Sequence, residues 1–247
     1  MAVDLADFER RATEAVQVFW STRKRASAAS GTTDIGSRGA VTAGKNLDGF
    51  LDLIRAVVVA NGLGEDTVYC GTQGTPRLRH TVLPGYYRPS KDWDALVVHG
   101  DELVAAVELK SQVGSFGNNF NNRAEEVVGM GEDLRVAFRE GLIGDAPRPF
   151  TGYLMLLEEA PGSSSAVRVS SGHFEPDAVF EGASYAERYE ILCGRLVREG
   201  LYDAATVLLS GAEGGAEGRF RDVSPTTSLR AFVARLAARV AEVAARG

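Results

Sequence analysis

The sequence predicts an α/β fold with a mixed central β-sheet flanked by helices. Short apolar runs at 95–98, 103–107 and 153–157 have the length and composition of buried strands. Longer segments with apolar residues at helical spacing precede, separate and follow these runs. The order helix, strands, helix, strand, helix, strand, helix is typical of an α/β core.

The first sixty residues predict two helices joined by a loop. Residues 4–25 carry apolar side chains at helical spacing, whereas residues 26–44 are rich in Ser, Gly, Thr and Ala and have no periodicity. A second helix follows Asn46, which can cap its start, and ends at Asn61-Gly62. We expect this helix to bury the face that carries Phe50, Leu51, Ile54 and Val58.

The middle of the chain predicts a β-hairpin. Residues 67–70 form a short strand, and residues 71–91 form a connection rich in Gly, Pro and Arg. The apolar runs that follow are joined by the short turn 99–102, so they pair as neighbouring strands.

Helices and strands alternate in the rest of the chain. The predicted elements are a helix at about 122–139, a break at 141–149, a strand at 152–157, a helix at 185–198, a strand at 205–209, an insertion at 210–218 and a helix that starts at 224–225. The 247 residues are enough for one large domain or two small ones. We expect a single domain over 1–247, with the helical and loop region 1–45 packed on the core.

Composition places the chain among ordinary soluble proteins. Apolar residues make up 45% and charged residues 24% of the sequence. There is no apolar run of about 18 residues, so no membrane span is expected, and the N-terminus lacks the basic-then-apolar order of a signal peptide. Cys70 and Cys193 lack zinc-site spacing and indicate reduced thiols. We therefore expect a cytoplasmic protein.

The net charge of −6 argues against a nucleic-acid partner, but the charge is unevenly distributed. No acidic residue lies between Asp66 and Asp92 or between Glu108 and Glu125. Such a chain can offer a basic face to DNA, although the same stretches could be solvated loops. The candidate phosphate contacts in the first stretch are Arg77, Arg79, Arg88 and Lys91.

Three charged residues meet at one end of the predicted hairpin. Asp94 opens the first strand, and Glu108 and Lys110 close the second. Alternation along a strand places Glu108 and Lys110 on the same face, and strand pairing can bring Asp94 beside them. Two carboxylates and an ammonium can hold a hard divalent cation and polarise a water molecule. Taken alone the pattern is weak, because many strands end in charged residues.

The segment directly after Lys110, residues 111–123, is predicted to be a polar loop. It has no acidic residue, and Asn and Arg side chains can read base edges or bind phosphate. Asparagine-rich turns also occur for structural reasons, because Asn tolerates left-handed backbone. Metal chemistry followed by such a segment suggests a nuclease. The candidate DNA contacts are Asn118, Asn119, Asn121, Asn122 and Arg123.

Asp94 with Glu108-Leu109-Lys110 resembles the core of the PD-(D/E)xK nucleases, except that Trp93 stands in place of proline. A longer match resembles the XhoI family of type II restriction endonucleases and covers nearly the whole chain. Its most specific part is the string from Phe116 to Arg123. The strings that carry it are Asp92-Trp93-Asp94, Glu108 to Gly114, Phe116 to Arg123, Ser184-Tyr185, Arg188 to Leu192, and Leu201-Tyr202-Asp203.

The resemblance implies a restriction-endonuclease-like core and a Mg²⁺-dependent homodimer. It implies cleavage of double-stranded DNA at the palindrome 5′-CTCGAG-3′ after the first C, leaving 5′ overhangs, and a DNA methyltransferase that acts on the same site. Two other functions stay open: a PD-(D/E)xK nuclease of DNA repair or recombination, and a non-catalytic DNA-binding protein.

The same resemblance gives each site residue an expected role. Asp94 and Glu108 would bind Mg²⁺, with the backbone carbonyl of Leu109 as a further oxygen ligand, and Lys110 would orient the attacking water. An acid from the preceding helix often joins such a site. The candidates there are Asp48 and Asp52, each of which could instead belong to a solvated helix flank. Nearer in sequence are Glu125 and Glu126, which could instead favour the dipole of their own helix.

Overall fold

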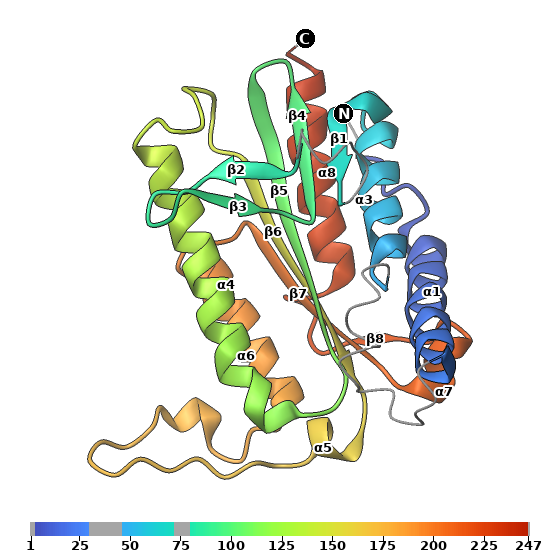
Figure 1. Cartoon of the computed structure of the whole chain (residues 1–247), viewed down its shortest axis with the longest axis vertical. Coiled ribbons are helices and arrows are strands. Elements are labelled where there is room, and N and C mark those ends of the chain that lie inside the picture. Colours follow the sequence, from blue (N-terminus) through green and yellow to red (C-terminus); the bar gives the residue numbers. More distant parts are fainter. Residues whose placement is uncertain (1–2, 30–45, 72–79, 247) are drawn as a thin grey trace.

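A computed structural model describes residues 3–29, 46–71 and 80–246 of the chain. Its centre is a six-stranded sheet with the order β1-β4-β5-β6-β7-β8 (Figure 1). β5, β6 and β7 run parallel to one another, whereas the other neighbours pair antiparallel, so the predicted mixed sheet is confirmed. The strands are β1 (Val68–Cys70), β4 (Ala95–His99), β5 (Glu102–Gln112), β6 (Phe150–Glu158), β7 (Ala204–Ser210) and β8 (Arg221–Asp222).

Helices cover both faces of this sheet, as the sequence predicts (Figure 1). One face packs on α1 (Phe8–Ala29), α3 (Asp48–Ala60) and α8 (Leu229–Ala244). The other packs on α4 (Phe116–Arg139) and α6 (Tyr185–Arg198). The short helical turns are η1 (Glu65–Thr67), α5 (Pro161–Ser164), η2 (Ala178–Phe180) and α7 (Ala212–Ala216).

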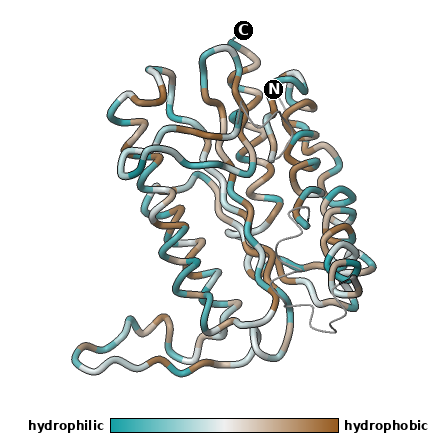
Figure 2. Tube along the Cα trace, in the orientation of Figure 1, coloured by the Kyte–Doolittle hydropathy of each residue, from teal (hydrophilic) through white to brown (hydrophobic). Residues whose placement is uncertain are grey.

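The inner strands are apolar on both sides because helices lie on both faces. Residues 103–109 of β5 are all buried, and so are residues 150–157 of β6. The tube along these inner strands is mostly coloured toward the hydrophobic end of the scale (Figure 2). Gly152 of β6 lets α8 approach closely, because an added Cβ would lie 2.8 Å from the ring of Phe232. Burying a charged residue on such a strand is costly unless it is paired, which makes Glu108 stand out.

A small second sheet lies within the segment predicted to be a connection. β2 (Val82–Pro84) and β3 (Ser90–Asp92) pair antiparallel and cross over β5 toward α4 (Figure 1). Trp93, directly after β3, packs with Leu96, Leu134 and their neighbours in a cluster of its own. Each strand has only three residues, which is too short for alternation to be visible in the sequence.

The segment 111–123 is not the predicted loop. β5 continues to Gln112, and α4 begins at Phe116. Phe116 and Phe120 lie one helical turn apart and pack on α6, with ring centroids 6.3 Å from Tyr185 and 5.1 Å from Tyr189 respectively. This packing explains why the helix includes the asparagines, and it leaves Asn118, Asn121 and Asn122 on the opposite, outer side.

Several helix boundaries also differ from the prediction. α1 continues to Ala29, and the rest of the predicted loop lies outside the described residues. The N-cap position of α3 is Leu47 and has no side-chain cap, so capping by Asn46 is wrong. α8 starts at Leu229 rather than at 224–225, because the Ser228 hydroxyl caps it by accepting the Ala231 N–H at 3.2 Å.

The two cysteines are free and buried, as expected. Among the described residues, no helix is long and apolar enough to cross a membrane.

Candidate active site

The structure brings Asp94, Glu108 and Lys110 together. The N–H of Leu109 donates to Asp94 Oδ2 at 2.7 Å, which fixes the start of β4 against the end of β5. Glu108 is 1% exposed, and its Oε1 accepts a hydrogen bond from Lys110 Nζ. Its other oxygen, Oε2, lies 2.9 Å from Lys91 Nζ on β3. The alternation of β5 therefore places Glu108 and Lys110 on one face, as predicted.

Asp94 is electrostatically strained in this site. Burial, followed by repulsion from Glu108, raises its pKa from 3.8 to about 6. The N–H of Leu109 and the ammonium groups of Lys110 and Lys91 oppose this shift but do not cancel it. A pair of neighbouring carboxylates with one raised pKa is stabilised by an added cation.

The donors fit a hard cation that keeps most of its water. Among the described residues, no group of three or more His, Cys, Asp or Glu side chains could hold a metal ion. Asp94 and Glu108 nevertheless supply two carboxylates, which is the usual protein share of a Mg²⁺ site, with water and phosphate oxygens as the other ligands. The site therefore suits Mg²⁺ in the presence of a phosphate and does not suit a closed structural metal.

We expect Asp94→Asn to stabilise the metal-free protein. Ionised Asp94 opposes folding, because its folded pKa lies above its unfolded one. This penalty is absent below pH 4, grows as the pH rises to about 6 and is then constant. The free energy of unfolding in urea with a chelator should rise by about 1–3 kcal/mol at pH 8.

The matched control is Asp101→Asn, in the exposed turn of the same hairpin. That change should alter the stability by less than about 0.5 kcal/mol. Equal effects of the two substitutions at pH 8 would contradict the assigned strain at Asp94.

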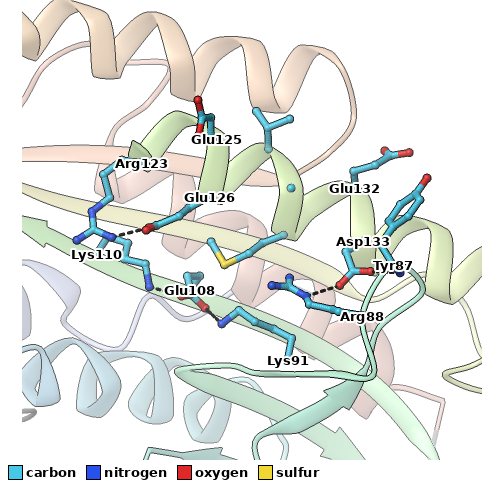
Figure 3. Close-up of a pocket in the computed structure, with 13 residues that line it drawn as sticks. Tyr87, Arg88, Lys91, Glu108, Lys110, Arg123, Glu125, Glu126, Glu132 and Asp133 are labelled. Carbon is cyan, nitrogen blue, oxygen red and sulfur yellow. Dashed lines mark hydrogen bonds and ion pairs between the residues drawn. The ribbon is translucent and has the colours of Figure 1, made fainter. Parts of the chain in front are cut away.

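The charged residues open into a cleft of about 660 Å³ between α4 and the β2–β3 hairpin. Figure 3 shows Lys91 and Lys110 pointing toward Glu108 from opposite sides, with α4 above them. Asp94 is not among the residues that line the cleft, and the N–H of Leu109 joins it to the strand that carries Glu108 and Lys110. The residues that line the cleft are Tyr87, Arg88, Lys91, Glu108, Lys110, Arg123, Glu125, Glu126, Val128, Gly129, Met130, Glu132 and Asp133.

Asp133 of α4 holds the hairpin in place. Its buried carboxylate accepts the backbone N–H groups of Tyr86 and Tyr87, both at 2.8 Å, and the Nε of Arg88 at 2.7 Å. Gly85 completes the turn, because an added Cβ would lie 2.6 Å from the Arg88 carbonyl oxygen and 2.7 Å from Asp133 Oδ2. The turn and strand β3 are therefore fixed against α4, with Lys91 beside Glu108.

The predicted DNA contacts lie mainly on α4. Asn118, Asn121 and Asn122 are exposed and share one face, because Asn121 and Asn122 follow Asn118 by three and four residues. Asn119 and Arg123 are half-buried on the adjacent stripe, and Arg123 pairs with Glu126 at the cleft. The asparagine surface is therefore continuous with the cleft.

Of the other predicted phosphate contacts, two line the cleft and two lie outside the described residues. Arg88 and Lys91 line the cleft, and each is bound to a carboxylate, Asp133 and Glu108 respectively. Arg77 and Arg79 lie outside the described residues.

Of the candidate additional acids, those on α4 line the cleft and those on α3 do not. Asp48 and Asp52 are exposed on α3, which packs on the opposite face of the sheet, and Asp52 pairs with Arg55 at 3.0 Å. Glu125 and Glu126 line the cleft.

The site also contains Asp133, which the sequence did not reveal. Asp133 lies three residues after Met130, on the apolar side of the helix. An acid at such a position indicates a buried carboxylate, which needs partners.

Comparisons with known proteins identify the family of this chain. The family model of the restriction endonuclease XhoI matches residues 26–222. The type II restriction enzyme XhoI of Xanthomonas vasicola is 50% identical over 214 residues, covering 86% of this chain and 84% of the relative. BstVI of Geobacillus stearothermophilus is 43% identical, covering 86% and 94%, and AbrI of Azospirillum brasilense is 47% identical, covering 70% and 77%. No solved structure matches. The chain therefore belongs to the XhoI family of type II restriction endonucleases, and its sheet and helices form the restriction-endonuclease-like core of that family.

Proposed function

We propose that this enzyme cleaves double-stranded DNA at 5′-CTCGAG-3′ after the first C, leaving 5′ overhangs, as a Mg²⁺-dependent homodimer. The observation that carries the chemistry is the position of Asp94 beside Glu108 and Lys110, the last two of which line the cleft. The target is supported by the 50% identity to XhoI over most of both chains. A palindromic target needs a two-fold protein, in which each subunit reads one half-site. A DNA methyltransferase acting on the same site would protect the host.

Asp94 and Glu108 would hold the Mg²⁺, with the carbonyl of Leu109 as a further candidate ligand. When bound, the ion supplies positive charge that polarises a phosphate oxygen and favours deprotonation of the attacking water. The bond between the Leu109 N–H and Asp94 keeps the two carboxylates in register. Lys110 points its ammonium toward Glu108 at the edge of the cleft, where it can orient the attacking water and stabilise charge on the pentacovalent transition state.

Recognition would come from the first turns of α4. The face that carries Asn118, Asn121 and Asn122 points outward and leads along the helix to the cleft. A helix fits the major groove, and asparagine can bind adenine there through two hydrogen bonds. This arrangement would place base reading on a helix that borders the cleft in which the phosphate is cleaved.

A plasmid carrying a single CTCGAG site tests the proposal. With Mg²⁺ the protein should produce one linear product with four-base 5′ overhangs, and with a chelator none. A matched plasmid with one changed base pair in each half-site should stay uncut. Cleavage at another defined sequence would overturn the target alone, whereas uncut but shifted DNA in Mg²⁺ would overturn the catalytic assignment. Sedimentation of the free protein at the mass of a monomer would contradict the dimer.

Replacing the outer asparagines one at a time by alanine should weaken specific binding more than non-specific binding. Loss of one bidentate contact to adenine costs about 1–3 kcal/mol, so we expect a drop of roughly 5- to 150-fold on the cognate duplex. Binding to a random duplex, measured at the same salt concentration, should change by less than about threefold. Equal losses on both duplexes would place that asparagine on the sugar–phosphate backbone.

A further inference from the structure

Two of the four lysines in the chain are bound to the same carboxylate. Lys110 binds Oε1 of Glu108, and Lys91 binds Oε2 at 2.9 Å. The Glu108 side chain is 2% exposed and that of Lys91 is 16% exposed, so this contact is largely shielded from water. Both oxygens of a proposed metal ligand therefore already have a cation beside them.

The position of Lys91 is imposed by the fold. Lys91 lies on β3, paired with Leu83 of β2, and the turn between these strands is bound to Asp133. The ammonium of Lys91 also donates to the carbonyl of Asp92 and lies 5.2 Å from the centroid of the Trp93 ring. The flexible side chain of a lysine on an unanchored loop could reach many partners, whereas the side chain of Lys91 is directed at Glu108.

We propose that the ammonium group of Lys91 pairs with Glu108 in the free enzyme and moves to a DNA phosphate when DNA binds. This inference rests on the proposed function, because it assumes that Glu108 binds the metal ion. A phosphate entering the cleft offers Lys91 a second anion, and its departure exposes Oε2 of Glu108 to the divalent ion. Lys91 would then contact the phosphate that it was predicted to bind from the sequence.

The consequence is coupling between metal and DNA. In the free enzyme the metal ion must displace Lys91 from a shielded carboxylate, so it binds weakly. With DNA in the cleft that competition is relieved. Because coupling between two binding sites is reciprocal, the metal ion must strengthen DNA binding by the same factor. Lys91 would thereby keep the occupancy of the metal site low until DNA binds.

Titration calorimetry of the intact protein with Mg²⁺, without DNA, tests this role. Lys91→Gln removes the competing charge and should tighten Mg²⁺ binding at least about tenfold, since unit charges this close interact by several kcal/mol near a protein surface. Lys91→Arg retains a cation and should bind Mg²⁺ like the wild type. Lys24→Gln, on the exposed surface of α1, removes the same charge elsewhere and should have no effect. Unchanged Mg²⁺ affinity in a folded Lys91→Gln protein would overturn the inference.

Glu108→Gln separates this inference from the proposed function. If this variant binds Mg²⁺ as well as the wild type, the metal site itself is wrongly assigned. If it loses Mg²⁺ binding while Lys91→Gln binds like the wild type, only the role of Lys91 fails.

A second measurement does not depend on the folding of Lys91→Gln. In a chelator, Glu108→Gln frees Lys91 and removes one negative charge from the cleft, so it should raise DNA affinity about tenfold. The same change made in Lys91→Arg should give a similar gain. No gain in either background would contradict the transfer of this cation to phosphate.

Discussion

Replacing Lys110 by alanine should reduce DNA cleavage by about 10²- to 10⁴-fold, whereas the loss of one positive charge from the cleft should lower DNA affinity by no more than about tenfold. The expected loss follows from the removal of a positioned charge that acts in the transition state, which typically contributes factors of 10² to 10⁴. Binding should largely persist because Lys110 is paired with Glu108 and is not one of the asparagines proposed to read bases. Glu108 keeps Lys91 as its second partner, so the variant should also fold.

The measurement combines single-turnover cleavage of the cognate duplex in Mg²⁺ with binding of the same duplex in a chelator. Lys24→Ala, on the exposed surface of α1, serves as the charge control and should behave like the wild type in both. Lys110→Arg retains the charge but not the geometry and should recover only part of the rate. Normal turnover by Lys110→Ala would remove the residue from the catalytic assignment.

The parts of this site that the sequence revealed are those encoded within a few residues. Glu108 and Lys110 are two apart on one strand, and a short turn fixes how that strand meets Asp94. Strand alternation and hairpin pairing are local rules, so the meeting of these three residues was predictable. The apolar runs of β5 and β6 predicted buried strands for the same reason.

The parts that the sequence did not reveal depend on contacts between distant segments. The pair of Lys91 with Glu108 spans 17 residues, and that of Arg88 with Asp133 spans 45. Local patterning carries no information about such partners, so Arg88 and Lys91 were predicted only as general phosphate contacts. The helical start of α4 was missed because its asparagines favour turns. The packing of Phe116 and Phe120 on α6 overrides that preference.

Helix α4 organises the whole substrate-facing side. Its first turns present the asparagines, its middle lines the cleft with Arg123 and Glu126, and its later turns bind the hairpin through Asp133. Displacement of this helix by DNA would move the hairpin, and with it Lys91, relative to Glu108. The hydrogen bonds of Asp133 therefore contribute to the stability of the fold and also set the position of Lys91 in the site.

Asp133→Asn should lower the free energy of unfolding by about 2–4 kcal/mol. Asp133 is 3% exposed and accepts three hydrogen bonds, one of them from a guanidinium. An amide cannot accept all three and places its own NH₂ near these donors, which leaves buried polar groups unsatisfied. The neighbouring Glu132 is the matched control, since within the described part of the chain its ion pair is with Arg135 near the surface, and Glu132→Gln should cost less than about 0.5 kcal/mol.

The pH dependence gives an independent check on the role of Asp133. Burial alone would raise the pKa of this carboxyl, but hydrogen bonds from the Tyr87 N–H, the Arg88 side chain and the Tyr86 N–H together lower it below 3.8. Its contribution to stability is therefore complete above about pH 4 and is lost as the pH falls through the folded pKa. Urea unfolding of the wild type and Asp133→Asn should differ most near neutral pH and converge in acid. A constant difference across that range, or a loss no larger than that of Glu132→Gln, would show that Asp133 is not what holds the hairpin over the site.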